Sequence, residues 1–397
     1  MNVQPGTEEL RRPLRVLFLT RTSLFSVPGG DTTQVLKTAE ALKKRGCEVT
    51  VSTEISPETV NFDLVHIFNL TRPQETYYQA LAARRRGIPV VLSPIYVDFS
   101  EYDCRARTGL SGKLLKHLSP SLAQTVKIAG RMVMNRECVG GSLRLLTTGY
   151  RRAQERLLSM ACVLLPNSHS EMRRIERDFR AAEGKQYVVV PNAIDPQLFL
   201  ATDVTPLEEY QDSVLCVGRI EGLKCQLELV RALKDTGLKL VLIGKPAPNQ
   251  KAYFHQIKRE AGPSVFILGE ISHEDLPKYY ASCKVHALVS WMETTGLSSL
   301  EAGAMGANLV ITDKGDTRDY FGDMVHYCSP DSMDSIRSAV LSAFHAPRNG
   351  LLRSRILDNY TWAEAAETTL SAYGIALSST GRGNAGRASS LSSSGQN

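Results

Sequence analysis

Short apolar runs alternate with longer amphipathic segments along most of the chain. The runs are rich in Val, Leu and Ile, which is typical of strands buried on both faces of a parallel sheet. We expect strands at residues 14–20, 47–53, 63–69, 88–96, 162–168, 186–195, 213–220, 238–244, 264–269, 285–290 and 308–313. We expect helices at residues 32–46, 76–87, 150–161, 168–179, 225–237, 250–262, 275–283, 297–305, 334–344 and 360–374. This alternation, twice over, predicts an α/β protein with two doubly wound, Rossmann-like sheets that face a cleft.

A break in the alternation divides the chain. Residues 196–212 follow no period and are rich in acids and prolines, as inter-domain linkers are. We therefore expect an N-terminal domain over residues 14–195 and a C-terminal domain over residues 196–357. A last helix within residues 358–376 is expected to return to the N-terminal domain. Residues 377–397 have almost nothing to bury, which predicts a disordered tail.

Ligands of doubly wound sheets bind at the carboxyl ends of the strands. The loops at these ends are therefore the candidate binding loops, at residues 27–31, 68–70, 94–98, 191–195, 218–224, 244–246, 269–272 and 290–296. Gly29 and Gly30 lie where the first strand leads into a helix. They lack the G-x-G-x-x-G spacing, so no dinucleotide site is predicted. They either let a ligand approach the backbone or only permit a tight turn.

Residues 289–310 combine a strand, a glycine turn and the start of a helix. This arrangement directs free backbone amides at a phosphate. Glu293 and Glu301 are eight residues apart, which would be about 12 Å along a continuous helix. That spacing suits the two ends of an elongated ligand and is too wide for carboxylates that share a proton. The alternative is one surface glutamate and one that interacts with the helix dipole.

Two basic residues follow the first strand of the expected C-terminal domain. Arg219 and Lys224 lie on one loop, where a guanidinium fork and an ammonium could clamp a diphosphate. Taken one at a time, each is more simply a solvated surface charge.

Composition places the chain among ordinary globular proteins. Hydrophobic residues make up 43% and charged residues 22% of its 397 residues. The eight cysteines are scattered without a C-x-x-C pair, which argues against a zinc site or a disulfide framework and for a reducing compartment. No run is long enough to span a bilayer, and the N-terminus lacks the apolar centre of a signal peptide. We expect a cytoplasmic protein with no metal or other cofactor.

The modest net charge of +6 is concentrated in residues 105–156. That region is rich in Arg and Lys, contains only two acids, and includes an expected helical insertion over residues 100–150. Leucine, valine and methionine interleave with the basic residues, as in helices that lie in a membrane interface. The region is expected either to bind an anionic membrane surface or to form a solvated basic rim. We expect no nucleic-acid partner.

Several motifs together resemble the retaining GT-B glycosyltransferases of the family-four type (glycosyltransferase group 1). They are PGG, VVPNAIDPQLF, VGRIEGLK, LVLIGK, VFILGEIS, ETTGLSSLE and the final YTW helix, and they extend over roughly residues 14–373. The resemblance implies a GT-B fold with an acceptor-binding N-terminal domain and a donor-binding C-terminal domain. It implies metal-independent transfer of a sugar, with retention, from a nucleotide-diphosphate-sugar to an acceptor hydroxyl. The implied acceptor is a sugar, lipid-linked or polysaccharide acceptor, in polysaccharide or glycolipid assembly.

The resemblance also assigns roles to individual residues. Arg219 and Lys224 would hold the diphosphate, Glu293 the transferred sugar, and Glu301 the donor ribose. The other implied donor-binding residues are Thr294, Thr295, Gly296, Leu297, Ile271, Gly218 and Asn192. Those on the acceptor side are Gly29, Gly30, His66, Asn69, Tyr96 and Asp98.

Three positions depart from the family pattern. Tyr96 stands where many relatives have a histidine, Ala193 replaces a glycine, and Cys225 replaces another. His66 matches a second recurrent histidine, although a buried, hydrogen-bonded imidazole is an equal alternative. Two other functions stay open: a non-catalytic GT-B-like protein that binds a nucleotide sugar, and, fitting less well, a GT-B sugar-nucleotide 2-epimerase.

Overall fold

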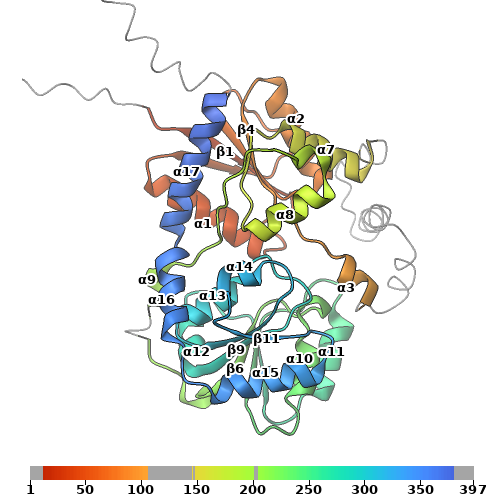
Figure 1. Cartoon of the computed structure of the whole chain (residues 1–397), viewed down its shortest axis with the longest axis vertical. Helices are drawn as coiled ribbons and strands as arrows, with labels where there is room; N and C mark the ends of the chain where they lie inside the picture. The colour runs from red at the N-terminus through yellow and green to blue at the C-terminus, as the bar shows by residue number, and fades with distance from the viewer. Residues whose placement is uncertain (1–11, 106–144, 146–147, 201–203, 380–397) are drawn as a thin grey trace, which may run out of the picture.

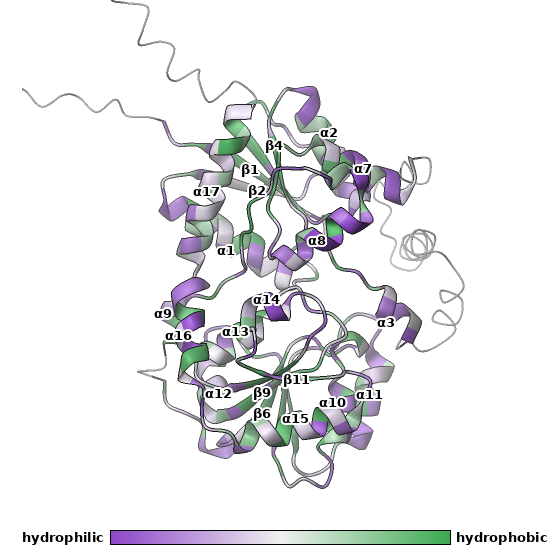
Figure 2. Ribbon diagram, in the orientation of Figure 1, coloured by the Kyte–Doolittle hydropathy of each residue, from purple (hydrophilic) through white to green (hydrophobic). Residues whose placement is uncertain are grey.

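A computed structural model of the protein describes residues 12–105, 145, 148–200 and 204–379. The described residues form two α/β domains, each with a parallel sheet at its centre and helices packed around it (Figure 1). The strands are the most hydrophobic parts of both domains, as Figure 2 shows. Buried side chains lie on both faces of each sheet, in two pairs of core clusters.

The N-terminal sheet has five strands: β1 (Arg15–Leu19), β2 (Glu48–Ser52), β3 (Leu64–Phe68), β4 (Val90–Ser93) and β5 (Val163–Leu164). Their spatial order is β2-β1-β3-β4-β5, and all pairs are parallel. The helices of this half are α1 (Gly30–Lys44), α2 (Pro73–Arg85), α3 (Ser100–Arg105), α7 (Tyr150–Met160) and α8 (His169–Asp178). A 3₁₀ turn follows at Arg180–Ala182.

The C-terminal sheet has six strands: β6 (Ser213–Val217), β7 (Leu240–Ile243), β8 (Val265–Gly269), β9 (Cys283–Leu288), β10 (Asn308–Thr312) and β11 (His326–Cys328). Their order is β11-β10-β9-β6-β7-β8, again with parallel pairs. Its helices are α10 (Gln226–Ala232), α11 (Lys251–Glu260), α12 (Leu276–Ser282), α13 (Leu297–Ala304), α14 (Thr317–Phe321), α15 (Met333–His345) and α16 (Gly350–Asn359). Two doubly wound sheets are thus confirmed as the fold class.

The last helix of the described chain crosses back to the first sheet. α17 (Trp362–Ser379) packs beside α1, and its buried residues Ala366 and Tyr373 belong to the same core cluster as β1 residues Val16 and Phe18 (Figure 1). The helix extends to Ser379, so residues 377–379 are helical where a disordered tail was expected. Alanines and a leucine continue the apolar face of the helix through these last turns. Residues 380–397 lie outside the described residues.

Local predictions differ from the structure in three further places. Residues 186–195 were expected to form a strand, but they form only isolated bridges, from Tyr187 to Leu164 and from Ile194 to Thr361. Pro166 follows β5 and Pro191 lies within the segment, and neither has the backbone N–H that a continuous ladder requires. The expected linker contains a short helix, α9 (Pro196–Phe199), and a 3₁₀ turn at Glu208–Tyr210. The predictions missed α14, α16 and β11, which are short or lack strong periodicity. Residues 106–144, most of the predicted insertion, lie outside the described residues.

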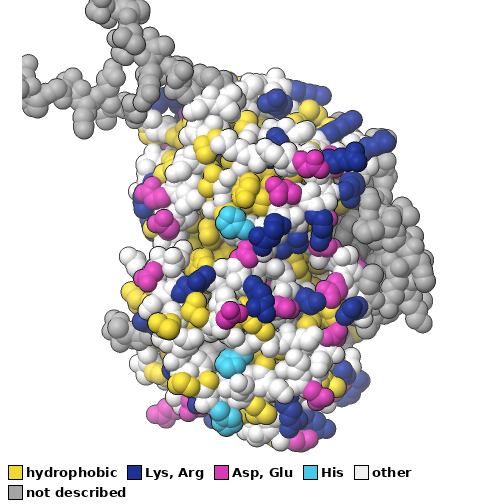
Figure 3. Space-filling model, in the orientation of Figure 1, with side chains coloured by type: hydrophobic (Ala, Val, Ile, Leu, Met, Phe, Trp, Pro, Cys, Tyr) yellow, Lys and Arg dark blue, Asp and Glu magenta, His cyan; other side chains and the backbone are white. Residues whose placement is uncertain are grey.

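Polar contacts between α8 and the start of α14, including the residue just before it, join the two domains. Ser170 donates from its backbone N and its Oγ to the two carboxylate oxygens of Asp319, at 2.8 and 2.7 Å. Arg174 forms an ion pair with the buried Asp316 at 2.6 Å. Burial raises the pKa of Asp316 to about 6 and that of the neighbouring Glu171 to about 8. Acidic and basic side chains are mixed on this face of the molecule where the domains meet (Figure 3).

Candidate active site

A cavity of about 690 Å³ lies between the two domains. It is lined by the loops after β1, β3 and β4 on one side and after β6 and β9 on the other. The structure brings together there all the predicted site residues except Ile271 and His66. Those that line the cavity are Gly29, Gly30, Asn69, Tyr96, Asp98, Asn192, Gly218, Arg219, Lys224, Glu293, Thr294, Thr295, Gly296, Leu297 and Glu301.

Lys224 and Glu293 form an ion pair at the cavity. Lys224 ends the 3₁₀ turn Gly222–Lys224 after β6, and its Nζ donates to Oε1 of Glu293 at 2.5 Å. Both side chains are largely buried, at 19% and 9% exposure. Arg219 is 43% exposed and only loosely paired with Glu221, at 3.4 Å. Lys224 therefore brings a fixed ammonium group to the cavity, and the guanidinium of Arg219 is free to reach an anion.

Two glycines set the position of the Glu293 loop. Gly315 has a φ of +87°, and a Cβ there would lie 2.0 Å from the carbonyl oxygen of Glu293, so only glycine fits against that loop. Gly296 has a φ of +74° and immediately precedes α13. The N-terminus of α13 consequently faces the cavity, with Gly296, Leu297 and Ser298 among the lining residues. Backbone amides at such a helix start favour an anionic ligand.

Glu301 lies one turn into α13 and is 7% exposed. Its Oε1 accepts from Nε2 of His273 at 2.9 Å and its Oε2 from the hydroxyl of Tyr280 at 2.8 Å. The hydrogen bond to Glu301 raises the pKa of His273. Sequence reasoning missed both partners, although His273 directly follows one of the expected binding loops. Helix α13 begins at Leu297, as expected from the glycine turn, so the distance of a continuous helix does not apply between the two glutamates.

Ile271 does not line the cavity. It packs against the core cluster of the C-terminal domain and is only partly buried. A contact from its backbone to a donor base, implied by the resemblance, therefore stays a prediction.

The structure does not place His66 at the site. Its ring is 1% exposed, and its two nitrogens form hydrogen bonds with the Tyr373 hydroxyl at 2.7 Å and with Ser93 Oγ at 2.9 Å. Burial lowers the pKa of His66 to about 3, which keeps the imidazole neutral. The acceptor-side role for His66 is corrected accordingly: it is a core histidine whose polar atoms are satisfied by β4 and α17.

Tyr96 lines the cavity but its polar groups are already paired. Its hydroxyl donates to Oδ2 of Asp178 at 2.8 Å and its backbone N donates to Glu171 at 2.6 Å. Burial and the Asp178 carboxylate raise the pKa of Tyr96, so this residue is a poor proton acceptor. Asp98 is nearby and forms an ion pair with Arg177 at 3.3 Å.

Asn192, shortly before the linker between the domains, contacts the loop that carries Glu293. Its Nδ2 donates to Thr295 Oγ1 at 3.0 Å, and its backbone N donates to the Tyr320 hydroxyl at 3.0 Å. The side chain is 4% exposed, yet its Oδ1 has no hydrogen-bond partner among the described residues. A buried acceptor of this kind favours a ligand that carries a hydroxyl or an amide donor.

The chain matches known glycosyltransferases in sequence. Residues 202–359 match the family model described as glycosyl transferases group 1. D-inositol 3-phosphate glycosyltransferase of Stackebrandtia nassauensis is 28% identical over 251 residues, 56% of this chain and 56% of its own. An uncharacterized glycosyltransferase of Methanocaldococcus jannaschii is 27% identical over 189 residues, 44% of this chain and 48% of its own. The chain thus spans about half the length of these curated relatives.

Solved structures share the fold over nearly the whole chain. Sucrose-phosphate synthase from Thermosynechococcus elongatus has a TM-score of 0.68 at 13% identity, covering 92% of this chain and 100% of its own. The Anabaena protein HepE, in complex with UDP and glucose, has a TM-score of 0.56 at 15% identity, covering 95% and 100%. A glycosyltransferase from Rickettsia africae has a TM-score of 0.63 at 12% identity, covering 92% and 99%. Residues 202–359 thus match the group 1 glycosyltransferase family, and the described chain shares the GT-B fold of these solved structures, as its motifs predicted.

Proposed function

We propose that the protein transfers a sugar, with retention, from a nucleoside-diphosphate-sugar to an acceptor hydroxyl. One observation carries the proposal: two basic residues, Arg219 and Lys224, share an inter-domain cavity with two buried glutamates, Glu293 and Glu301. A donor with a sugar, a diphosphate and a ribose offers a matching partner for each of these groups.

Each group has a chemical task in this reaction. Negative charge grows on the diphosphate as the sugar bond breaks, and Arg219 and Lys224 would stabilise that charge. Glu293 would accept hydrogen bonds from hydroxyls of the transferred sugar and keep Lys224 in place. Glu301 would accept hydrogen bonds from the ribose, competing with His273 and Tyr280 for its oxygens.

On the N-terminal side of the cavity, few side chains could act as the base that takes the proton of the acceptor hydroxyl. Tyr96 donates to Asp178, and Asp31 is paired with Arg21. We therefore propose that the departing diphosphate oxygen takes the proton while the acceptor attacks from the same face, which gives retention.

A panel of UDP-, GDP- and ADP-sugars tests the proposal. Release of nucleoside diphosphate that depends on an added acceptor supports it, and the anomeric configuration of the product decides retention. Tight binding without turnover would favour the non-catalytic alternative, and a changed configuration at C2 of an intact donor would favour the epimerase.

The acceptor is proposed to be a sugar, lipid-linked or polysaccharide acceptor. The Stackebrandtia relative is named for D-inositol 3-phosphate, so phosphorylated polyols belong in the acceptor panel as well. Product formation with one class and not the others assigns the acceptor.

Activity is expected to survive EDTA. Arg219 and Lys224 already supply positive charge at the predicted diphosphate position, so the leaving group does not depend on a divalent cation. The measurement is turnover before and after chelation. Complete loss that magnesium or manganese restores would contradict this expectation.

We also propose a cytoplasmic protein that associates with anionic membrane surfaces through its basic region, residues 105–156. No helix of the described residues is long and apolar enough to cross a bilayer. On α7 the apolar residues Ala153, Leu157 and Leu158 are buried against the domain, while Arg151 and Arg152 are exposed. A membrane contact by α7 itself would thus be electrostatic, and the apolar part would have to come from residues 106–144.

Co-sedimentation with vesicles tests the membrane proposal. Binding to anionic vesicles at low salt, weakened by salt and absent with neutral vesicles, is expected. If the protein stays in the supernatant with anionic vesicles at low salt, the membrane proposal is wrong. The basic region would then be a solvated rim, and the acceptor would be soluble.

A further inference from the structure

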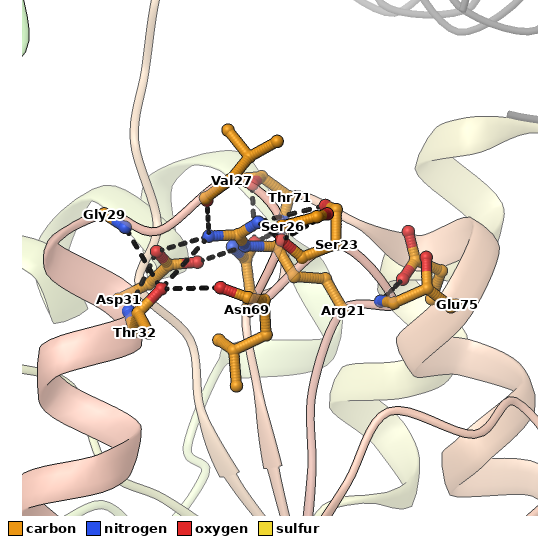
Figure 4. A network of polar contacts seen from close by, with 12 residues as sticks. Arg21, Ser23, Ser26, Val27, Gly29, Asp31, Thr32, Asn69, Thr71 and Glu75 are labelled. Carbon is orange, nitrogen blue, oxygen red and sulfur yellow. Dashed lines mark hydrogen bonds and ion pairs between the residues drawn. The ribbon is translucent and has the colours of Figure 1, made fainter. Parts of the chain in front are cut away.

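Arg21, in the loop between β1 and α1, carries a buried guanidinium at the edge of the cavity (Figure 4). Its side chain is only 5% exposed. Nε and Nη2 donate to the two carboxylate oxygens of Asp31, at 2.6 and 2.9 Å. A buried charge is costly unless it is paired and hydrogen-bonded, and a bidentate carboxylate satisfies that condition.

The other guanidinium contacts hold the backbone of the same loop. Nη1 donates to the carbonyl oxygen of Ser23 at 2.8 Å, and Nη2 donates to the carbonyl oxygen of Val27 at 2.9 Å. One planar group therefore ties together the start, the middle and the end of residues 21–31. A lysine could keep the charge but could not span these acceptors, because it has no fork.

This loop carries Gly29 and Gly30 to the donor half of the cavity. A Cβ on Gly29 would lie 3.8 Å from Nη1 of Arg219, and a Cβ on Gly30 would lie 3.8 Å from Cδ1 of Leu297. The start of α1 thus approaches a predicted diphosphate ligand and the turn before α13. Small movements of the loop would change the part of the cavity where the sugar bond is predicted to break.

Side chains of α2 also hold the first residues of the loop through hydrogen bonds. Glu75, which is 2% exposed, accepts from the backbone N of Thr22 at 2.5 Å. The buried Gln79 donates to the carbonyl oxygen of Thr20 at 2.9 Å. These contacts fix the base of the loop. Its far end is held by Arg21 and Asp31 together with Thr32, whose Oγ1 accepts from the backbone N of Gly29 at 3.0 Å and from Nη2 of Arg21 at 3.4 Å.

We propose that Arg21 is a positioning residue for sugar transfer: through the loop it holds the Gly29–Gly30 turn against Arg219 and Leu297. The inference rests on the proposed function, since its effect is exerted on the donor end of that site. Misplacing a catalytic group by about 1 Å can lower turnover on the order of 100-fold, which sets the expected size of the effect.

The test compares Arg21→Gln and Arg21→Lys with the control Arg12→Gln. Arg12 also forms a bidentate pair, with Asp63 at 2.6 and 3.0 Å, but it is exposed and lies outside the cavity. In Arg21→Gln we expect kcat to fall about 100-fold, with a much smaller change in the Kd of nucleoside diphosphate, whose predicted ligands lie mainly in the C-terminal domain. Arg12→Gln should leave both unchanged.

Two further readouts separate positioning from mere support of the fold. Guanidinium ion, added below denaturing concentrations, should restore part of the activity of Arg21→Gln. Hydrogen exchange should show that nucleoside diphosphate protects the amides of Gly29 and Gly30 in the wild type and less in Arg21→Lys. If Arg21→Gln does not fold, Arg21→Lys decides, with a tenfold or greater loss of kcat expected at a melting temperature close to that of the wild type.

Arg21→Lys with wild-type kcat and wild-type protection of the two glycine amides would overturn the inference. Failure of the proposed function looks different, because the wild type itself would then show no turnover with any donor. The exchange experiment still decides the role of Arg21 in that case, since it requires only nucleotide binding.

Discussion

Replacing Lys224 by alanine is expected to lower turnover by about 1,000-fold while the protein stays folded. A preorganised donor at a developing anion is typically responsible for a factor of about 100 to 1,000 in kcat, and Lys224 is one of two such groups predicted for the diphosphate. Its Nζ is fixed by Glu293 and its side chain is mostly shielded from water. The ammonium group therefore does not have to move or shed ordered water when the charge develops. The measurement is single-turnover transfer at saturating donor.

The Lys224–Glu293 pair allows a second explanation, in which the lysine only compensates a buried carboxylate. The double variant Lys224→Ala with Glu293→Gln distinguishes the two. If Lys224 only neutralises Glu293, the second change should restore activity; if it acts on the diphosphate, the double variant should be no faster than Lys224→Ala. Lys245→Ala is the matched control, because Lys245 also pairs with a glutamate, Glu270, on a neighbouring strand-exit loop outside the cavity. Full activity of Lys224→Ala would remove Lys224 from the site.

The positions of most site residues could be predicted from the sequence because they depend on topology. A residue just after a buried strand of a parallel sheet has to lie at the carboxyl edge of that sheet. Arg219, Glu293 and the Gly29–Gly30 turn all follow such strands, and the structure places all of them around one cavity. The strand assignments thus placed these loops at the carboxyl edges of the two sheets, and the resemblance to the family selected the individual residues.

The partners of these residues could not be predicted in the same way. Glu301 accepts from His273 and Tyr280, which lie on other elements, and that pairing depends on side-chain packing between α12, α13 and the loop after β8. His66 shows the opposite failure. Its match to a recurrent histidine of the family suggested an acceptor-side role, but α17 returns from the far end of the chain and places Tyr373 beside it. A contact over 307 residues of sequence leaves no local signal.

Arg21 was missed for a related reason. An arginine after a strand reads as a solvated charge, since arginines are mostly exposed. Only the fold of residues 21–31 reveals that this guanidinium is buried against Asp31 and two carbonyl groups. The sequence contains the glycine turn at the cavity, whereas the group that holds this turn becomes visible only in three dimensions.

Replacing Glu301 by alanine is expected to lower kcat/KM for the donor by about 100-fold. Hydrogen bonds to a charged group contribute about 1.5–3 kcal/mol each, and a ribose can offer two hydroxyls to the carboxylate. In the free protein these oxygens are occupied by His273 and Tyr280, which keep the carboxylate in place for the ligand. The change should also lower the pKa of His273, because the hydrogen bond that raises it is lost; a proton NMR titration of the imidazole checks this.

A double-mutant cycle, with one change in the protein and one in the ligand, tests whether the effect of Glu301 is exerted on the ribose. Wild type and Glu301→Ala are each tested with the nucleoside diphosphate and with its 2′- and 3′-deoxy analogues. If Glu301 binds the ribose, the variant should discriminate against the analogues far less than the wild type does. Glu228→Ala is the matched control, because Glu228 also accepts from a largely buried tyrosine, Tyr253 at 3.2 Å, but lies on α10 outside the cavity. Equal discrimination in Glu301→Ala and the wild type would mean that Glu301 only supports His273 and Tyr280, and the ribose would have to be recognised elsewhere in the cavity.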